Sequence, residues 1–328
     1  MQRRKWLVVG VTVMGLVLGL VPGTAVASGA GCRTVEIPVA MSAGRPVDAK
    51  ISGTLCRPRG RDRGVVQVLI PGGGYDRNYW SWGSSYVEAM NRAGYTTFAL
   101  DRIGTGRSSA PPSSSFAPDS QVFTIHQVLR RFRHQRVVLV GNSLGSTVSR
   151  MIAVHYPDDV DGLILTGESS TPNWPAFEQL GADYVTASQH PLLAGRGLDD
   201  GYGVLRPGAR LGWFYYGPTT DRAVLRRDEA NPEPDVFSSD PEFGSVELNR
   251  RIKVPVLVVV GQYDRLICGP GASDCSSSAA LLAGERPYYA PTADLQAIAV
   301  PSTGHVLNLH RTAPTFYPLL ARWTQRHI

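Results

Sequence analysis

The sequence places a serine in a context that could make it a nucleophile, the pentapeptide Gly141-Asn142-Ser143-Leu144-Gly145. The pentapeptide follows the apolar run 137–140, which is typical of a parallel strand buried on both faces, and precedes a helix-compatible segment. Glycines at both ends permit a sharp strand-to-helix turn that a Cβ atom would obstruct. Such a turn lifts the Ser143 hydroxyl above the sheet edge and directs free helical N–H groups toward it. The pattern is informative only if the chain also supplies catalytic partners.

Two further residues could activate this serine. A serine hydroxyl is a weak nucleophile until a general base takes its proton, and a histidine base needs a carboxylate that holds its tautomer. Asp264 and His305 each stand shortly after a predicted core strand, in the chain order Ser143, Asp264, His305. Because the carboxyl ends of parallel strands meet at one sheet edge, we expect the three side chains to converge. Glu168 also follows a predicted strand and is the alternative acid, although we favour Asp264.

A glycine-rich loop, Pro71-Gly72-Gly73-Gly74-Tyr75, ends the apolar run 65–70. Successive glycines let the main chain pass close to a ligand with its N–H groups exposed, although a plain flexible loop is an alternative. A second glycine-punctuated stretch, residues 101–109, lacks the last glycine of a dinucleotide-binding fingerprint because Ser109 stands there. We therefore expect no nucleotide cofactor.

The elements that must position these residues alternate along the chain. Apolar runs bounded by glycine and proline predict strands, and runs with helical periodicity predict helices. This alternation predicts an α/β fold with a mostly parallel central sheet flanked by helices. Strands are expected at 34–40, 48–56, 65–70, 95–100, 136–140, 160–166, 254–260 and 294–300, and helices at 84–92, 120–134, 144–156 and 313–325.

The alternation lapses between residues 171 and 249, a segment rich in proline, glycine and aromatic residues. We interpret it as a lid or cap inserted over the carboxyl edge of the sheet, where open α/β sheets bind ligands. A peripheral subdomain without substrate contact is the alternative. Residues 31–170 and 250–328 then form the core. Tyr75, Trp174 and Trp213 are the candidate substrate-binding aromatics, and they indicate a substrate with substantial apolar surface.

These motifs together resemble those of the α/β-hydrolase family, over roughly residues 60–170 and 250–328. The pentapeptide around Ser143 is similar to the family's nucleophile elbow, and residues 101–108 are similar to its Asp-Arg-x-Gly-x-Gly-x-Ser loop. Gly261-x-x-Asp264 and Gly304-His305 match the usual acid and base positions, although some members carry the acid where Glu168 stands. Residues 71–74 resemble the family's oxyanion loop, with proline in place of the usual histidine.

The resemblance implies a serine esterase or lipase-like enzyme that uses neither a metal nor another cofactor. Ser143 would attack a carbonyl, His305 would take the proton, and Asp264 would orient His305. The N–H of Leu144, together with that of Gly73 or Gly74, would hold the oxyanion. The expected substrate is a small apolar ester, thioester or lactone.

Other interpretations share parts of this pattern. Aspartate-nucleophile branches of the family, the epoxide hydrolases and dehalogenases, are disfavoured by a serine at the elbow. An aminopeptidase would need acidic lid residues to hold an amine, for which Glu178, Asp183 and Glu229 are the candidates. An acyltransferase would use the same three residues. A non-enzymatic binding protein of this fold typically lacks a triad member, and none is lacking here.

The first 30 residues resemble an export signal. Arg3-Arg4-Lys5 is a basic start, residues 7–21 are apolar, and Ala25-Val26-Ala27 is a small-residue cleavage site. The apolar run is short for a membrane span, so we expect a secreted protein without a stable membrane anchor. Export through a general or a twin-arginine route stays open. The net charge of +6 has no basic block beyond residue 5, so nucleic-acid binding is not expected.

The four cysteines all lie beyond this signal. Four cysteines allow three pairings, and in an oxidising compartment we expect nearest neighbours to pair as Cys32–Cys56 and Cys268–Cys275. Unpaired buried thiols are the alternative. Zinc is not expected, because neither pair has the close spacing of a metal knuckle. The sequence does not define an oligomeric state.

Overall fold

The structure, a computed structural model, describes residues 31–237, 242 and 245–328. The predicted signal peptide, residues 1–30, lies outside the described residues. Among the residues that the structure describes, no helix is both long and apolar enough to cross a membrane.

A mostly parallel eight-stranded sheet forms the centre of the chain, in the order β1-β2-β4-β3-β5-β6-β9-β10. Only β2 runs against its neighbours, because it pairs antiparallel with both β1 and β4. The chain order reverses around β3, and this is the place where open α/β sheets bind ligands beyond the strand ends. The strands are β1 (Cys32–Val39), β2 (Ala49–Cys56), β3 (Val65–Ile70), β4 (Thr96–Leu100), β5 (Arg136–Asn142), β6 (Gly162–Thr166), β9 (Val256–Gly261) and β10 (Gln296–Val300).

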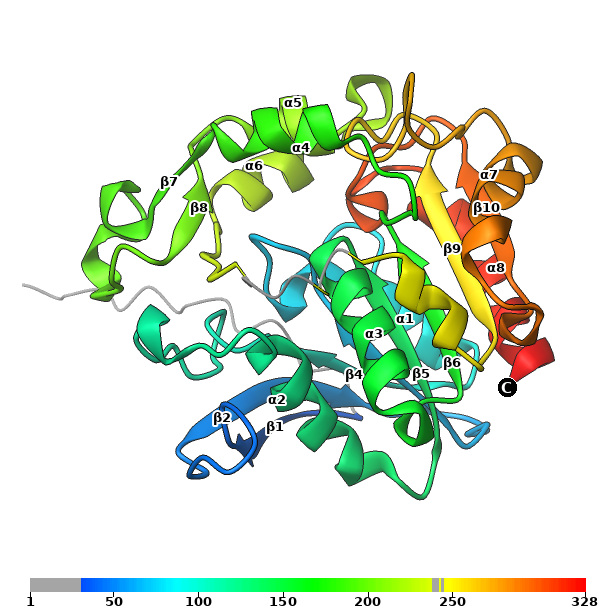
Figure 1. Ribbon diagram of the computed structural model, residues 1–328, viewed down its shortest axis with the longest axis horizontal. Coiled ribbons are helices and arrows are strands. Elements are labelled where there is room, and N and C mark those ends of the chain that lie inside the picture. Colours follow the sequence, from blue (N-terminus) through cyan, green and yellow to red (C-terminus); the bar gives the residue numbers. More distant parts are fainter. Residues whose placement is uncertain (1–30, 238–241, 243–244) are drawn as a thin grey trace, which may run out of the picture.

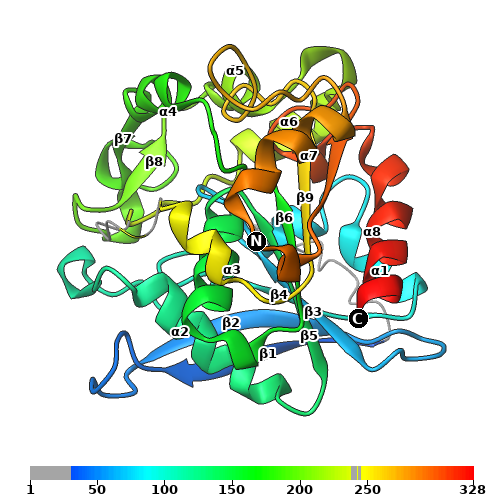
Figure 2. The same cartoon turned by 45° about the vertical axis from the view of Figure 1, so that its right-hand side comes forward.

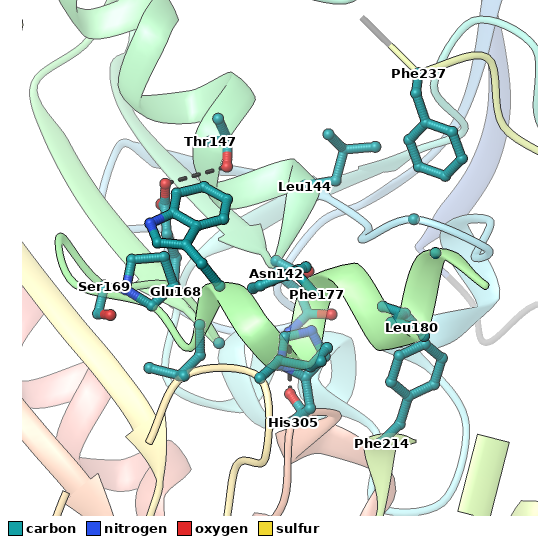
Figure 3. Close-up of a pocket in the computed structure, with 18 of the residues that line it drawn as sticks. Asn142, Leu144, Thr147, Glu168, Ser169, Phe177, Leu180, Phe214, Phe237 and His305 are labelled. Carbon is teal, nitrogen blue, oxygen red and sulfur yellow. Dashed lines mark hydrogen bonds between the residues drawn. The ribbon is translucent and has the colours of Figure 1, made fainter. Parts of the chain in front are cut away.

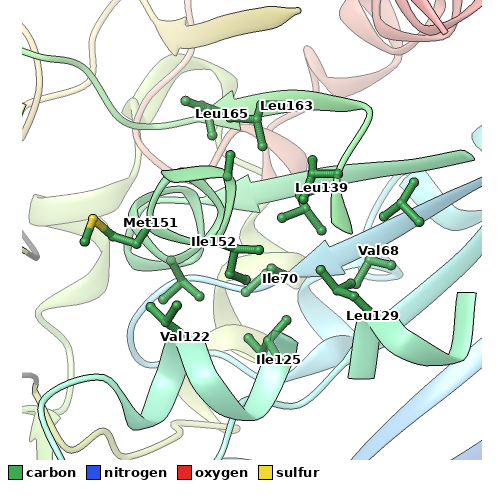
Figure 4. Close-up of a cluster of buried hydrophobic side chains, with 14 of the residues drawn as sticks. Val68, Ile70, Val122, Ile125, Leu129, Leu139, Met151, Ile152, Leu163 and Leu165 are labelled. Atoms are coloured by element: carbon green, nitrogen blue, oxygen red, sulfur yellow. The ribbon is translucent and has the colours of Figure 1, made fainter. Parts of the chain in front are cut away.

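Helices cover both faces of this sheet (Figures 1 and 2). Successive side chains of a strand point to opposite faces, so an all-apolar strand contributes to two hydrophobic clusters. In β5, Val137 and Leu139 pack on one side, and Val138 and Val140 pack on the other. Figure 4 shows the first cluster, in which side chains of α2 and α3 pack against the sheet. The flanking helices are α1 (Tyr86–Arg92), α2 (Ser120–Leu129), α3 (Leu144–His155), α7 (Ser278–Glu285) and α8 (Ala313–His327).

The segment between β6 and β9 leaves the sheet and lies above the strand ends at the top of Figure 1. Its elements are short, and β7 and β8 form a separate antiparallel pair. They are α4 (Trp174–Gly181), β7 (Tyr184–Thr186), β8 (Gly203–Leu205), α5 (Arg210–Phe214) and α6 (Arg222–Glu229).

Most sequence-predicted elements are present with ends shifted by one or two residues. The helix predicted over 120–134 is shorter, because α2 ends at Leu129 and tightens into a 3₁₀ turn, Arg130–Phe132. Phe132 still packs on the sheet, with its ring centroid 5.4 Å from that of Phe98. Both disulfides expected from nearest-neighbour pairing are present, Cys32–Cys56 across the β1–β2 pair and Cys268–Cys275 in the loop after β9.

Candidate active site

Ser143 occupies a strained turn between β5 and α3. Its φ of 51° and ψ of −120° are unusual for a residue with a side chain, and such conformations cluster at functional sites. The flanking residues must be glycines, because neighbouring backbone atoms leave no room for a Cβ atom. A Cβ atom on Gly145 would lie 2.1 Å from the Ile70 carbonyl oxygen, and one on Gly141 would lie 2.4 Å from the Ser146 backbone nitrogen. The local sequence is therefore selected for a turn that presents the Ser143 hydroxyl.

His305 and Asp264 lie together beyond the ends of β10 and β9. The His305 Nδ1 atom is 2.8 Å from Asp264 Oδ2, and both side chains are buried, with 3% and 0% exposed. The second carboxylate oxygen of Asp264 accepts the Leu266 N–H at 3.0 Å. A carboxylate at Nδ1 keeps the proton on that nitrogen, which leaves Nε2 of His305 as the basic atom.

Glu168, the alternative acid, contacts residues of α3 and not His305. Its Oε1 accepts a hydrogen bond from the Thr147 hydroxyl at 3.1 Å, as Figure 3 shows, and another from Arg150 Nε at 3.1 Å. Its contacts thus tie the end of β6 to α3. Burial raises the pKa of the Glu168 carboxyl, and the Arg150 guanidinium opposes that rise. The contacts made by His305 favour Asp264 over Glu168 as its partner.

The two candidate oxyanion donors after β3 differ in what they contact. The Gly74 N–H donates to Asp235 Oδ2 at 2.5 Å, so it is occupied. In the described part of the chain, neither the Gly73 N–H nor the Leu144 N–H has a hydrogen-bond acceptor. This difference favours Gly73 over Gly74 as a donor, since an engaged N–H cannot receive an oxyanion without breaking its own bond.

Ser143 and His305 share one cavity of about 520 Å³ between the sheet edge and the inserted segment. Its volume falls in the usual range for small-molecule sites. Figure 3 shows side chains from α3, α4 and the loops around them directed into it. Its apolar lining comprises Tyr75, Leu144, Pro172, Trp174, Phe177, Leu180, Tyr184, Phe214, Phe237, Val246, Leu266 and Ile267.

Two of the three predicted substrate-binding aromatics, Tyr75 and Trp174, line this cavity, and Trp213 does not. The assignment of Trp213 is wrong because its indole N–H donates to Asp183 at 2.7 Å. Its ring also lies 3.8 Å from the Arg265 guanidinium, so both its edge and its face are in use. Phe214 and Phe237 line the cavity instead, and the sequence marks them only as members of an aromatic-rich segment. No cluster of three or more metal-ligating side chains occurs within the described ranges.

His310 supports the loop that carries His305, and sequence reasoning did not single it out. Its Nε2 accepts the N–H groups of Tyr216 at 2.9 Å and Gly304 at 3.2 Å, and its Nδ1 lies 2.9 Å from the Val306 carbonyl oxygen. This arrangement requires a neutral ring with its proton on Nδ1. Burial lowers the pKa of His310 to about 4.

We expect His310 to make stability depend on pH. A histidine in the unfolded chain has a pKa near ~6.5, so between pH 6.5 and 4 the unfolded state binds more protons than the native state. Native stability therefore falls as pH drops through this window, by about 2 kcal/mol at pH 5 from this group. Urea unfolding at pH 7.5 and pH 5 should show that His310→Gln loses less stability on acidification than the wild type. His134→Gln, at an exposed histidine, is the control. Equal acid sensitivity of wild type and His310→Gln would contradict this assignment.

Comparisons with known proteins agree with this fold. A model of the α/β hydrolase fold matches residues 67–193. The chain is 28% identical over 237 residues to a 2-hydroxy-6-oxononadienedioate/2-hydroxy-6-oxononatrienedioate hydrolase of Paraburkholderia phymatum, covering 66% of this chain and 77% of that protein. It is 26% identical over 220 residues to Lipase 1 of Psychrobacter immobilis, and the match covers 63% of this chain and 65% of that protein. The crystal structure of a Bacillus subtilis carboxylesterase superposes with a TM-score of 0.58 and 16% identity. The superposition covers 88% of this chain and 91% of the carboxylesterase.

The sheet order, the strained serine turn and the inserted segment are those of the α/β-hydrolase fold. The chain thus has the α/β-hydrolase fold, and its residues 67–193 match the model of that fold. Its relatives support its assignment as a hydrolase.

Proposed function

We propose that this protein is a serine hydrolase that cleaves esters of largely apolar substrates through an acyl-enzyme. The observation that carries the proposal is the pairing of His305 with Asp264 at 2.8 Å at the wall of the cavity that also contains Ser143. The two disulfides and the signal-like first 30 residues support a secreted protein, and we include export in the proposal.

In the proposed mechanism, the Ser143 oxygen attacks the substrate carbonyl carbon while His305 Nε2 takes the hydroxyl proton. Asp264 stabilises the imidazolium that forms. The N–H groups of Gly73 and Leu144 hold the oxyanion. When the tetrahedral intermediate collapses, the C–O bond to the leaving alcohol breaks and His305 returns the proton to that alcohol. Water, deprotonated by the same nitrogen, then releases the acid and restores Ser143.

The lining of the cavity supports an apolar acyl or alcohol group. Within the described residues, Glu168 is the one carboxylate in the lining and Arg150 the one arginine, and they pair with each other at 3.1 Å. The site therefore contributes little net charge to a bound substrate. Burial of each methylene group stabilises a complex by about 0.8 kcal/mol, which corresponds to roughly a fourfold gain in affinity.

The aminopeptidase alternative receives less support. An enzyme of that class needs a carboxylate positioned to hold the substrate amine, and Asp183 and Glu229 are engaged within the insertion. Asp183 pairs with Arg206 at 2.7 Å, and Glu229 accepts the N–H groups of Gly208 and Arg210. Neither lines the cavity, and Glu178 does not either. A substrate with two carboxylates, as in the name of the Paraburkholderia relative, is likewise disfavoured, since Arg150 is already paired.

The test is hydrolysis of p-nitrophenyl esters across a series of acyl lengths. We expect kcat/KM to rise about fourfold per methylene until the cavity is filled, and then to fall. Phe177→Ala removes a ring from the lining and should shift the optimum to longer chains. Phe123→Ala, at a half-buried phenylalanine of α2 that is not in the lining, is the matched control. A flat profile, or the same shift in both variants, would contradict the assigned cavity. Added alcohol acceptors would reveal acyl transfer as ester products.

A further inference from the structure

Two buried arginines hold the oxyanion loop, residues 71–75: Arg210 donates to the Gly74 carbonyl oxygen at 3.0 Å, and Arg102 binds the first two residues. Arg102 Nε donates to the Pro71 carbonyl oxygen at 3.0 Å, and its Nη2 donates to the Gly72 carbonyl oxygen at 2.9 Å. The Arg102 side chain is 0% exposed. A guanidinium provides a rigid fork of donors, so it fixes the direction of both carbonyl groups at once.

The charge of Arg102 is balanced by a residue of the insertion, Asp235. Asp235 Oδ1 lies 2.6 Å from Arg102 Nη2, and Asp235 Oδ2 accepts the Gly74 N–H at 2.5 Å. The Asp235 side chain is 1% exposed. One carboxylate thus joins the two ends of the oxyanion loop, one directly through Gly74 and the other through the guanidinium that holds Pro71 and Gly72.

Asp235 is itself fixed within the insertion. Its backbone N–H and carbonyl group exchange hydrogen bonds with Gly203 of β8, both at 2.8 Å. Two residues further on, the Phe237 ring lines the cavity and is 4.0 Å from the point where a Cβ atom of Gly73 would stand. The insertion therefore contacts the oxyanion loop at Gly74 and lies against Gly73.

We propose that Asp235 is a positioning residue for the oxyanion hole, an inference that rests on the proposed function. Its carboxylate holds the Gly74 N–H and Arg102 together, and so fixes the conformation in which the Gly73 N–H faces the same point as the Leu144 N–H. The residue touches neither the nucleophile nor the base. It acts on the transition state alone, because the oxyanion forms only after Ser143 attacks.

The charge of Asp235 is essential to this role. A neutral amide can accept the Gly74 N–H, but it cannot balance the buried guanidinium, and a buried charge without its partner draws in water or moves away. Arg102 would then shift, and with it the Pro71 and Gly72 carbonyl groups. The Gly72 carbonyl group and the Gly73 N–H belong to one planar peptide, so the N–H would turn with the carbonyl group and point away from the oxyanion.

The test compares Asp235→Asn with Glu233→Gln. The Glu233 side chain is a matched control. Its carboxylate accepts the Gly106 N–H at 2.9 Å and pairs with Arg196 at 3.2 Å, whereas only its backbone N–H, which Glu233→Gln retains, contacts the oxyanion loop at the Gly74 carbonyl oxygen. With a p-nitrophenyl ester, Asp235→Asn should lower kcat about 10- to 100-fold and leave KM within about threefold. A trifluoromethyl ketone, which forms a tetrahedral oxyanion on the serine, should bind weaker by a similar factor. Glu233→Gln should match the wild type in kcat, in KM and in its affinity for the ketone.

Two results would overturn the inference. One is an Asp235→Asn variant whose kcat and ketone affinity equal those of Glu233→Gln. If Asp235→Asn fails to fold, Arg102→Lys replaces it, because an ammonium group retains the charge but cannot hold both carbonyl groups. A wild-type kcat in Arg102→Lys is then the second overturning result. An inert wild type would refute the proposed function, whereas an active wild type with an unchanged variant refutes only the role of Asp235.

Discussion

Ser143→Ala should abolish ester hydrolysis, with kcat reduced at least about 10⁴-fold, because no other group then forms the acyl-enzyme. The residual rate comes from the oxyanion donors and from substrate binding, which the substitution leaves in place. The variant should fold, since alanine keeps the Cβ atom of serine and lacks only its hydroxyl group. The measurement is kcat for the preferred p-nitrophenyl ester, with thermal unfolding of both proteins as the control.

Two features make Ser143 the decisive residue. Its backbone occupies an unusual conformation, in a turn that leaves no room for a Cβ atom at Gly141 or Gly145. Its hydroxyl shares the cavity with His305. Within this cavity Ser169 is the other serine, and its hydroxyl accepts a hydrogen bond from Ser273 at 2.8 Å. If Ser143→Ala retained activity and Ser169→Ala lost it, the nucleophile would be misassigned.

Asp264→Asn should lower kcat about 10⁴-fold, the second largest effect that we expect. The amide group of asparagine can donate to His305 Nδ1, which would place the ring proton on Nε2, where the base is needed. Unlike a carboxylate, it also cannot stabilise an imidazolium. The activity of the variant should return in part at high pH, where hydroxide can act as the base.

Glu168→Gln is the matched control for this prediction. Glu168 is the other carboxylate that follows a core strand at this edge of the sheet, but its Oε1 contacts Thr147 and Arg150. The variant should retain kcat within about tenfold of the wild type. A large loss in Glu168→Gln together with a small loss in Asp264→Asn would exchange the roles of the two acids.

The sequence alone sufficed for the features that depend on local patterns. Strand and helix alternation predicted the sheet, because a parallel strand covered on both faces must be apolar where it is buried, as β9 and the central residues 137–141 of β5 are. The Gly-x-Ser-x-Gly turn was predictable because only glycine tolerates the close contacts at 141 and 145. Nearest-neighbour pairing of the cysteines followed from their spacing within a hairpin and a short loop.

Features that depend on packing between distant parts of the chain could not be predicted from local sequence patterns. Trp213 and Trp174 look alike in an aromatic-rich segment, and only the fold reveals that Trp213 is enclosed by Asp183 and Arg265. Asp235 stands in a stretch without secondary structure of its own, 161 residues from the Gly74 N–H that it accepts. No periodicity or motif marks such a contact, because it is formed by two loops that meet only when the chain is folded.

The most direct test of a serine nucleophile at this site is trapping with a fluorophosphonate, followed by mass spectrometry of the digested protein. We predict one adduct per chain, on the peptide that contains Ser143, and suppression of labelling by the preferred ester. Asp264→Asn should label much more slowly, and Ser143→Ala should not label at all. An adduct on another residue, or an unlabelled wild type that is nevertheless folded and hydrolyses esters, would contradict the account.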